Sequence, residues 1–403
     1  MSRRVVITGM GLVSCIGNEL DTVAAALRDG RSGIRRIDEY AALELRSQVA
    51  GVPSIADEPA IDRKIRRYMG DAALYAYCAM RRALDDARLA PVDMASPRVG
   101  LVVGSGIGSA QHIIENVDTM RAKGRHKLPP YLVPRVMASS ASACLSTAYG
   151  IRGASYSISS ACATSAHCMG SAFDLIAAGR QDIVIAGGCE EIYWAGMMFF
   201  DAMGVLSTAY NDHPLTASRP YDAARDGFVL AGGAGIVVME ALEHAQARGA
   251  RAHLEMTGYG SSSDGSDMVA PTVEGPADAM RAAVQSLGQR VDYINTHATS
   301  TPQGDTAEVK AMQAVFGDAL PAFSSTKGLT GHPIAAAGAH EAIYCALMMR
   351  DGFVAGSPTV QALEPALEGL PLVRETREAR IDAVLSNSLG FGGTNVSLAF
   401  RRV

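Results

Sequence analysis

Short apolar runs rich in β-branched residues alternate along the chain with segments whose apolar residues recur at helical spacing. The apolar runs predict strands at residues 4–8, 99–103, 155–159, 183–186, 234–240, 253–259, 293–296, 383–387 and 396–401. The helical spacing predicts helices at residues 21–29, 66–87, 163–178, 274–287, 306–316 and 338–350. Nearly all-apolar strands separated by helices are typical of an α/β fold with a parallel or mixed sheet buried on both faces.

Two segments of the chain share one pattern. The run YSISSACATSAHCMGSAFDLIAAG at residues 156–179 is echoed by AFSSTKGLTGHPIAAAGAHEAIYCALMMRDG at residues 322–352. In both, a strand ends in serines, a turn of small residues follows, and a helix runs to a glycine. The repeat predicts two related α/β halves, at residues 1–250 and 251–403.

Composition narrows the class of protein. With 403 residues, 48% of them hydrophobic, the chain is long enough to bury a substantial core. A net charge of −5 argues against nucleic acid as a main partner. The longest uncharged stretch, residues 153–173, is too polar for a membrane helix, and the N-terminal residues lack signal-peptide features. The seven cysteines form no CxxC pair and no metal-ligand spacing, so a reduced, cytoplasmic protein is expected.

Cys162 is the first candidate for chemistry. A strand pattern ends in small residues just before it, and a helix-compatible run begins just after it. Its thiol is therefore expected beside a helix N-terminus, where unpaired N–H groups and a partial positive charge favour the reactive thiolate. A cysteine in this position, with histidines supplied from elsewhere in the chain, suits acyl-transfer chemistry.

The second half of the chain supplies those histidines. His297 follows an apolar strand in NTHATSTPQGD, and His332 lies in SSTKGLTGHP, five residues after Lys327. Such strand-to-helix turns are where a parallel sheet presents its active site. One histidine at a turn is more often structural, but two, each in a turn of Gly, Ser and Thr, favour a function.

Two glycine-rich segments, residues 9–11 and 104–108, also follow apolar strands. Ser14 and Ser109 occupy the third-glycine positions of a GxGxxG motif, and a Walker lysine is absent from the sequence. Both segments are therefore predicted to be tight turns rather than nucleotide-binding loops.

Several motifs, in this order, resemble the β-ketoacyl-[acyl carrier protein] synthases of the thiolase superfamily, most closely the synthase I type. The motifs are SSACATSAHC, SRPYDAARDGFVLAGGAG, NTHATSTPQGD, SSTKGLTGH and SNSLGFGGTN. The similarity extends from VVITGMGLVSCIGN to the final strand. It implies a thiolase-like fold, in which two related βαβ halves form a layered α-β-α-β-α core.

The resemblance implies an acyltransferase that condenses an acyl-enzyme thioester with malonyl-[acyl carrier protein] in a decarboxylative Claisen reaction of fatty-acid elongation. Cys162 would accept the acyl group, and the backbone N–H groups of Cys162 and Phe391 would form the oxyanion hole. His297 and His332 would bind the malonyl thioester carbonyl and stabilise the enolate left when carbon dioxide departs. One of them could also activate a water molecule.

Further positions take roles from the same resemblance. Lys327 and Glu341 would form an ion pair that supports the His332 turn. Substrate-binding positions of the family match Thr299, Thr301, Ile107, Phe200 and Gly392. No cofactor or catalytic metal is expected, because phosphopantetheine arrives on the carrier protein. Some members hold a structural monovalent cation at positions that match Asn295, Glu341, Ser386 and Asn387, and the sequence leaves such a site open.

Four positions depart from the synthase I pattern and would reshape the acyl pocket. Ile107 is typical of synthase II enzymes, Leu389 stands where Phe is usual, Ala298 replaces a common Gly, and Gly196 replaces a Met. A ketosynthase of a specialised aryl polyene or polyketide pathway is therefore the alternative function. A degradative thiolase, which has a second cysteine, and a chain-length factor, which lacks the nucleophile, are disfavoured by Cys162 and the two histidines.

Two basic segments, IDRKIRRYMG and TMRAKGRHK, suit an acidic carrier protein, although a solvated surface is the alternative. Their expected contacts are Arg63, Lys64, Arg67, Arg125 and Lys127. Similar enzymes dimerise through the edge strand before the nucleophile, here residues 155–159. A homodimer that binds acyl carrier protein, without nucleic acid or membrane insertion, is therefore expected.

Overall fold

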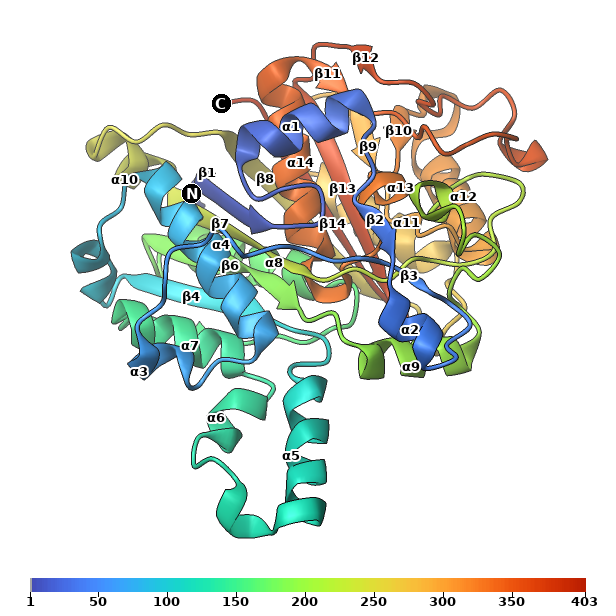
Figure 1. Ribbon diagram of the computed structural model, residues 1–403. Coiled ribbons are helices and arrows are strands. Elements are labelled where there is room, and N and C mark those ends of the chain that lie inside the picture. The colour runs from blue at the N-terminus through green and yellow to red at the C-terminus, as the bar shows by residue number, and fades with distance from the viewer. Residues whose placement is uncertain (1) are drawn as a thin grey trace.

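The computed structural model describes residues 2–403 (Figure 1). The strands are β1 (Val5–Val13), β2 (Ile34–Arg36), β3 (Val49–Gly51), β4 (Val99–Gly104), β5 (Ser155–Tyr156), β6 (Ile183–Glu190), β7 (Gly233–Ala241), β8 (Leu254–Ser263), β9 (Tyr293–Asn295), β10 (Ala322–Ser324), β11 (Phe353–Val354), β12 (Arg377–Glu378), β13 (Ala383–Gly390) and β14 (Thr394–Arg401). The α-helices are α1 (Leu20–Asp29), α2 (Asp38–Ala42), α3 (Arg63–Arg66), α4 (Asp71–Ala87), α5 (Ala110–Lys123), α6 (Leu132–Val136), α7 (Ser140–Tyr149), α8 (Thr164–Ala177), α9 (Trp194–Met203), α10 (Leu242–Ala247), α11 (Glu274–Val284), α12 (Pro302–Phe316), α13 (Lys327–Thr330) and α14 (Ala337–Asp351). Short 3₁₀ turns are η1 (Pro91–Ala95), η2 (Arg125–Lys127), η3 (Pro214–Thr216), η4 (Gly317–Ala319), η5 (Ile334–Ala336) and η6 (Pro365–Leu367).

A mixed sheet runs through the molecule in the order β10-β9-β13-β14-β8-β1-β7-β6-β4-β5. The two ends of the sheet have the same pairing pattern when each is followed from its outer edge toward the centre. In both β10-β9-β13-β14-β8 and β5-β4-β6-β7-β1, two parallel pairs are followed by two antiparallel pairs. A short antiparallel pairing of β1 with β8 joins them. The strand order thus repeats within the chain, while the boundary at residue 250 stays a prediction.

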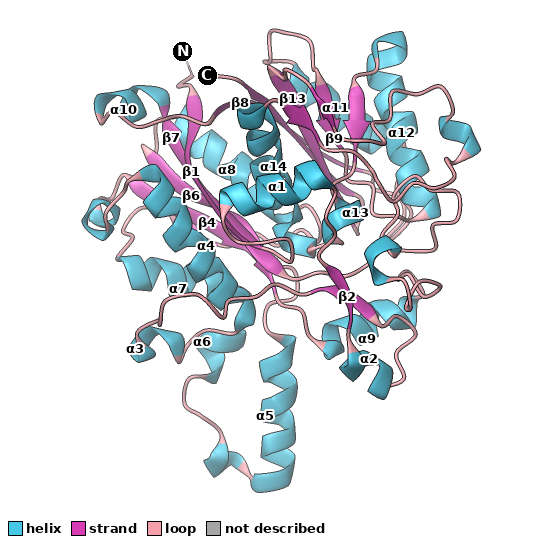
Figure 2. Ribbon diagram, turned by 45° about the horizontal axis from the view of Figure 1, so that its top comes forward, coloured by secondary structure: helices cyan, strands magenta, loops and turns pink. Residues whose placement is uncertain are grey.

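Helices divide these strands into layers. α8 and α14 lie between the two strand groups, where they share a buried apolar cluster with β1, β7 and β13 (Figure 2). α4 and α7 cover the outer face of one group, and α11 and α12 cover the outer face of the other. The α-β-α-β-α layering predicted from the sequence is therefore present. Within residues 2–403, every helix is too short or too polar to cross a membrane.

The glycines at positions 9 and 11 lie inside β1, so the tight turn predicted there is wrong. A Cβ atom at Gly9 would lie 2.2 Å from the carbonyl oxygen of Ala83 in α4. Glycine is required because the helix backbone approaches the strand directly. The relation recurs in the other half, where a Cβ at Gly258 of β8 would lie 1.8 Å from the carbonyl oxygen of Ala283 in α11.

The other predicted elements all form, with shifted ends. The helix predicted at residues 66–87 begins at Asp71, after a separate short helix, α3. The strand predicted at 155–159 ends at Tyr156. The apolar pattern missed α5, whose only buried residue is Ala110, because this helix extends away from the body together with α6 (Figure 1).

Candidate active site

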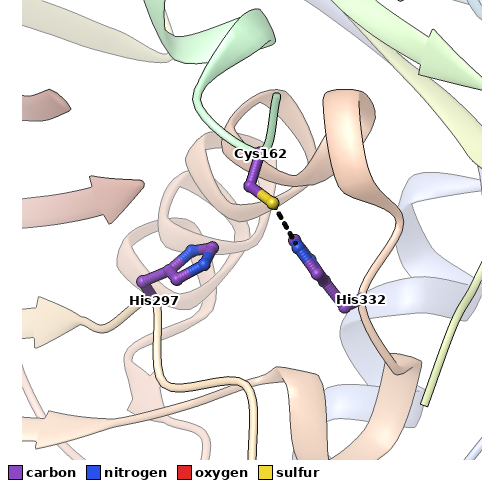
Figure 3. A group of neighbouring side chains, drawn as sticks. All are labelled: Cys162, His297 and His332. Carbon is purple, nitrogen blue, oxygen red and sulfur yellow. Dashed lines mark hydrogen bonds between the residues drawn. The ribbon is translucent and has the colours of Figure 1, made fainter. Parts of the chain in front are cut away.

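Cys162 lies in the turn that connects β5 to α8, just before the helix begins at Thr164. Ala161 has a φ of 49°, in the left-handed region that residues with a Cβ avoid. Strained turns of this kind persist where surrounding contacts enforce them, and they are common at functional sites. Here the turn directs the thiol toward two histidines (Figure 3).

His297 and His332 reach Cys162 from the other half of the chain (Figure 3). His297 follows β9, and His332 follows α13. His332 Nε2 lies 2.9 Å from Cys162 Sγ, and the two imidazole rings meet edge to face with centroids 5.1 Å apart. All three side chains are buried. The fold thus brings together the three residues that the sequence singled out.

Burial opposes the thiolate that the helix N-terminus favours at Cys162. Burial raises the pKa of the Cys162 thiol to about 12, although the positive charge of Lys327 and the backbone N–H of Phe391 oppose this rise. The desolvation of a buried anion outweighs the helix N-terminus here, because α8 offers only partial charge. Burial therefore favours the thiol form of Cys162, and His332 Nε2 is the adjacent nitrogen that is able to accept its proton.

Both active-site imidazoles are neutral near pH 7. Burial lowers the pKa of His297 and of His332 well below 6.5, and the charge of Lys327 lowers both further. A neutral imidazole carries one N–H donor and one acceptor nitrogen, so each ring is able to accept a proton or to donate a hydrogen bond.

The loop after β13 approaches the same thiol. A Cβ at Gly390 would lie 3.1 Å from the carbonyl oxygen of Ser160 and 3.3 Å from the backbone nitrogen of Cys162. Glycine at this position allows the loop to lie directly against the nucleophile turn. The N–H groups of Cys162 and Phe391 thereby flank the thiol, as an oxyanion hole requires.

Lys327 and Glu341 form a buried ion pair beneath His332. Lys327 begins α13, and Glu341 lies in α14. Burial raises the pKa of Glu341 to about 7, an effect that the adjacent Lys327 opposes. The lysine charge acts on both histidines and on the thiol, so the pair sets the electrostatics of the site as well as its packing.

Glu308 is a site residue that the sequence analysis missed. Its fully buried carboxylate in α12 accepts hydrogen bonds from the backbone N–H of His297 at 2.9 Å and of Ala298 at 2.8 Å, and from Asn387 Nδ2 at 3.0 Å. These contacts fix the turn that carries His297. The sequence held one signal that could have identified Glu308. At helical spacing, Asp305 and Glu308 fall on the same face of α12 as the apolar Val309, and that face is buried.

A cavity of about 420 Å³ opens beside Cys162, His297 and His332. Among the positions predicted to bind substrate, Phe200, Thr299 and Thr301 line it, together with Leu389, Ala298 and Phe391. Ile107 and Gly392 lie outside the lining residues, and the Gly392 N–H donates instead to the carbonyl oxygen of Met268 at 2.8 Å. Gly196 lies in α9, where its missing side chain faces open space.

Two sets of side chains have the donors to hold a cation. Asn295 Oδ1, Glu341 Oε2 and Ser386 Oγ are buried without a hydrogen-bond partner among residues 2–403. These oxygens belong to three of the four residues that match the monovalent-cation site suggested by the resemblance, whereas Asn387 is occupied, with Nδ2 on Glu308 and Oδ1 on Ser397.

Cys162, His297 and His332 form the second set of possible cation ligands. The ligand atoms of Cys162, His297 and His332 lie within 4.8 Å of one another, and their types would suit zinc. Two observations favour acyl transfer over metal binding for these three residues. The Phe391 N–H faces the Cys162 thiol, and the cavity beside them is largely apolar.

The five basic residues expected at a carrier-protein surface are all exposed. Arg63 and Lys64 begin α3, and Arg67 follows it, stacked over the rings of Tyr68 and Tyr131. Arg125 and Lys127 lie in η2, between α5 and α6. All five are outside the set of described residues that line the cavity. Within one copy of the chain they lie in α3, just after α3 and in η2, and not around Cys162.

Two family models match the chain. The Beta-ketoacyl synthase, N-terminal domain, matches residues 2–245, and the Beta-ketoacyl synthase, C-terminal domain, matches residues 253–361. The chain belongs to the β-ketoacyl synthase family.

This β-ketoacyl synthase is 52% identical over 402 residues to the 3-oxoacyl-[acyl-carrier-protein] synthase 1 of Haemophilus influenzae, with 99% of each chain covered. It is 51% identical over 403 residues to the enzyme of that name from Escherichia coli K12, with 100% of this chain and 99% of the other covered. The crystal structure of a β-ketoacyl synthase from Burkholderia phymatum matches with a TM-score of 0.94 at 36% identity over the whole of both chains. These likenesses confirm the predicted family and fold class.

Proposed function

We propose that this synthase condenses an acyl group held on Cys162 with malonyl-[acyl carrier protein] and so extends acyl chains in fatty-acid synthesis. The observation that carries the proposal is the contact of Cys162 Sγ with His332 Nε2, at one end of a largely apolar cavity and beside the Phe391 N–H. The 51–52% identity to synthases named for this reaction supports it.

The first half-reaction transfers the acyl group to the enzyme. Cys162 Sγ attacks the thioester carbonyl of the acyl carrier protein while the thiol proton passes to His332 Nε2. The N–H groups of Cys162 and Phe391 stabilise the oxyanion of the tetrahedral intermediate. The carrier thiolate leaves and takes up the proton from His332, which restores a neutral imidazole.

The second half-reaction forms the carbon–carbon bond. The malonyl thioester carbonyl accepts a hydrogen bond from each imidazole, which for His332 requires the tautomer with its proton on Nε2. These hydrogen bonds stabilise the enolate that forms when the C–COO⁻ bond breaks and carbon dioxide leaves. The enolate carbon attacks the acyl carbonyl on Cys162, and collapse of the tetrahedral intermediate expels the Cys162 thiolate, which takes up a proton from water to restore the thiol. The low pKa values of His297 and His332 suit this role, because both remain neutral donors near pH 7.

The phosphopantetheine arm of the carrier protein is expected to pass Thr299 and Thr301 on its way to the thiol. The two hydroxyls lie 3.2 Å apart and line the cavity. On this proposal the arm is the only prosthetic group that the reaction uses. The oxygens of Asn295, Glu341 and Ser386 would hold a monovalent cation that supports the site without entering the reaction.

We infer that the enzyme acts as a homodimer in the cytoplasm. β5 is an edge strand, and Tyr156 within it is exposed. α5 also exposes Ile113, Val117 and Met120 at helical spacing. A second copy would cover both features. The basic residues of α3 and η2 would then receive the acidic carrier protein.

Acylation tests the proposal most directly. The protein is mixed with acyl-[acyl carrier protein] thioesters from short to long, and its intact mass and peptide map are measured. A single acyl adduct on Cys162 is expected, and the chain lengths that load define the pocket. Absence of an adduct at every length would contradict the proposal and favour a specialised pathway.

A further inference from the structure

The turn between β4 and α5 is held by two adjacent buried carboxylates at the end of β6. Glu190 accepts hydrogen bonds from the backbone N–H of Gly106 at 2.9 Å, the N–H of Ile107 at 3.1 Å and the hydroxyl of Ser105 at 3.1 Å. Glu191 binds the other end of the segment, where it accepts the N–H of Gln111 at 2.9 Å in the first turn of α5. Each carboxylate therefore fixes a different part of one segment.

The part fixed by Glu190 lies directly behind the cavity wall. A Cβ at Gly106 would lie 2.6 Å from Glu190 Oε2 and 3.2 Å from Cγ2 of Ile334. Ile334 lines the cavity and packs in one apolar cluster with Cys162. The turn is thus separated from the space beside the nucleophile by a single side chain.

The reaction described above makes no use of Glu190, although this carboxylate is only 1% exposed. Within residues 2–403 its hydrogen-bond donors are those of the turn, and a basic partner is absent. A buried carboxylate without a cation is costly unless several donors satisfy it. Burial raises the pKa of Glu190 to about 7, and its charge is felt at the Cys162 thiol. Such a group requires a role that an apolar residue would not fill.

We propose that Glu190 is a positioning residue that holds the Ser105–Gly108 turn against Ile334 and thereby sets the acyl length that the cavity accepts. The inference rests on the proposed function, since acyl length has meaning only for an enzyme that loads acyl groups on Cys162. A fixed turn keeps Ile334 in place beside a growing chain. A loosened turn lets Ile334 yield, which admits longer chains.

The test compares Glu190→Gln with the unmodified enzyme, using butanoyl- and decanoyl-[acyl carrier protein] as acyl donors. Gln places an amide N–H against a backbone N–H donor, so the turn loses one of its contacts. We expect the ratio of kcat/KM for decanoyl to that for butanoyl to rise about fivefold or more. The change should appear in the KM for decanoyl, with kcat for butanoyl within about twofold of the unmodified value.

Glu191→Gln is the matched control, because it removes an equivalent buried charge that contacts α5 instead of the Ile334 side of the turn. It should leave the ratio unchanged. If Glu190→Gln does not fold, Ser105→Ala removes one donor from the same carboxylate and should shift the ratio in the same direction. A ratio within about twofold of the unmodified enzyme in a folded Glu190 variant overturns the proposal, as does an equal shift in Glu191→Gln. Failure of the unmodified enzyme to load either chain would instead contradict the proposed function.

Discussion

His332 Nε2 lies 2.9 Å from Cys162 Sγ, and the two residues occupy equivalent places in the repeated plan of the fold. Cys162 lies between β5 and α8, and His332 lies between β10 and α14. β5 and β10 are the two outermost strands of the sheet, while α8 and α14 pack against each other in its middle layer. Cys162 and His332 therefore meet only when the two strand groups pack together, so on the proposed mechanism the folding of both is a condition for activity.

Substitution of Cys162 separates the two half-reactions. Cys162→Ser should abolish condensation, because the hydroxyl is a much weaker nucleophile and leaving group than the thiol. Cys162→Gln should also abolish condensation but leave decarboxylation of malonyl-[acyl carrier protein] intact, since that step uses the two imidazoles. Release of carbon dioxide and the mass of the β-ketoacyl product measure the two activities. Condensation retained by either variant would contradict the mechanism.

Glu308 offers a test of a residue whose role is purely positional. Glu308→Gln replaces one acceptor oxygen by an N–H donor beside the backbone donors of His297 and Ala298. Leaving such a donor unsatisfied costs about 1–3 kcal/mol of folding free energy. We expect a lowered denaturant midpoint and a condensation rate reduced about tenfold or more by misplacement of His297. Glu368→Gln, at an exposed position, is the control. Unchanged stability and rate in the Glu308 variant would show that these contacts are unimportant.

The sequence singled out Cys162, His297 and His332 because each lies in a turn of small residues between a strand pattern and a helix pattern, a signal that is local in the chain. It could not predict Glu308, whose partners lie in the turn after β9 and on β13 and are brought together only by packing. The assignment of residues 9–11 to a turn failed for a similar reason. A glycine that accommodates a helix packed against a strand has the same local pattern as a glycine in a turn, and only the position of α4 distinguishes them.

The protonation state of Cys162 was also beyond local reasoning. The position before a helix favours a thiolate, but the degree of burial depends on residues from distant segments, including Phe391 and Ile334. Burial disfavours the charged form more strongly than a helix end favours it. Local sequence therefore identifies Cys162 as the candidate nucleophile, whereas its ionisation depends on contacts that the sequence does not show.

The Lys327–Glu341 pair should control the acid limb of the pH profile. The neutral imidazoles are the active forms, and the charge of Lys327 lowers the pKa of His297 and of His332. In the double variant Lys327→Met/Glu341→Leu this charge is absent, so both pKa values rise toward 6.5. The condensation rate should then fall at a higher pH than in the unmodified enzyme when it is measured from about pH 8 to about pH 5.

Stability distinguishes this electrostatic role from packing. Lys327→Met alone leaves Glu341 buried without its cation, which should cost roughly 3–5 kcal/mol in urea unfolding, whereas the double variant should recover most of that loss. If the recovered double variant also keeps the original acid limb, the charge of Lys327 has no influence on the histidines.

His340 in α14 should make the folded state sensitive to acid. Its ring is 2% exposed beside Tyr344, and burial lowers its pKa to about 4. Because the folded-state pKa is lowered below the unfolded value near 6.5, the unfolded chain binds more protons between these values, and stability falls as pH falls from about 6.5 to about 4. His340→Leu removes this contribution, so the loss of unfolding free energy between about pH 7 and about pH 5 should be about 2 kcal/mol smaller than in the unmodified protein. His126→Gln, at an exposed site in η2, should leave the loss unchanged. An equal loss in the His340 variant would mean that other groups account for the acid sensitivity.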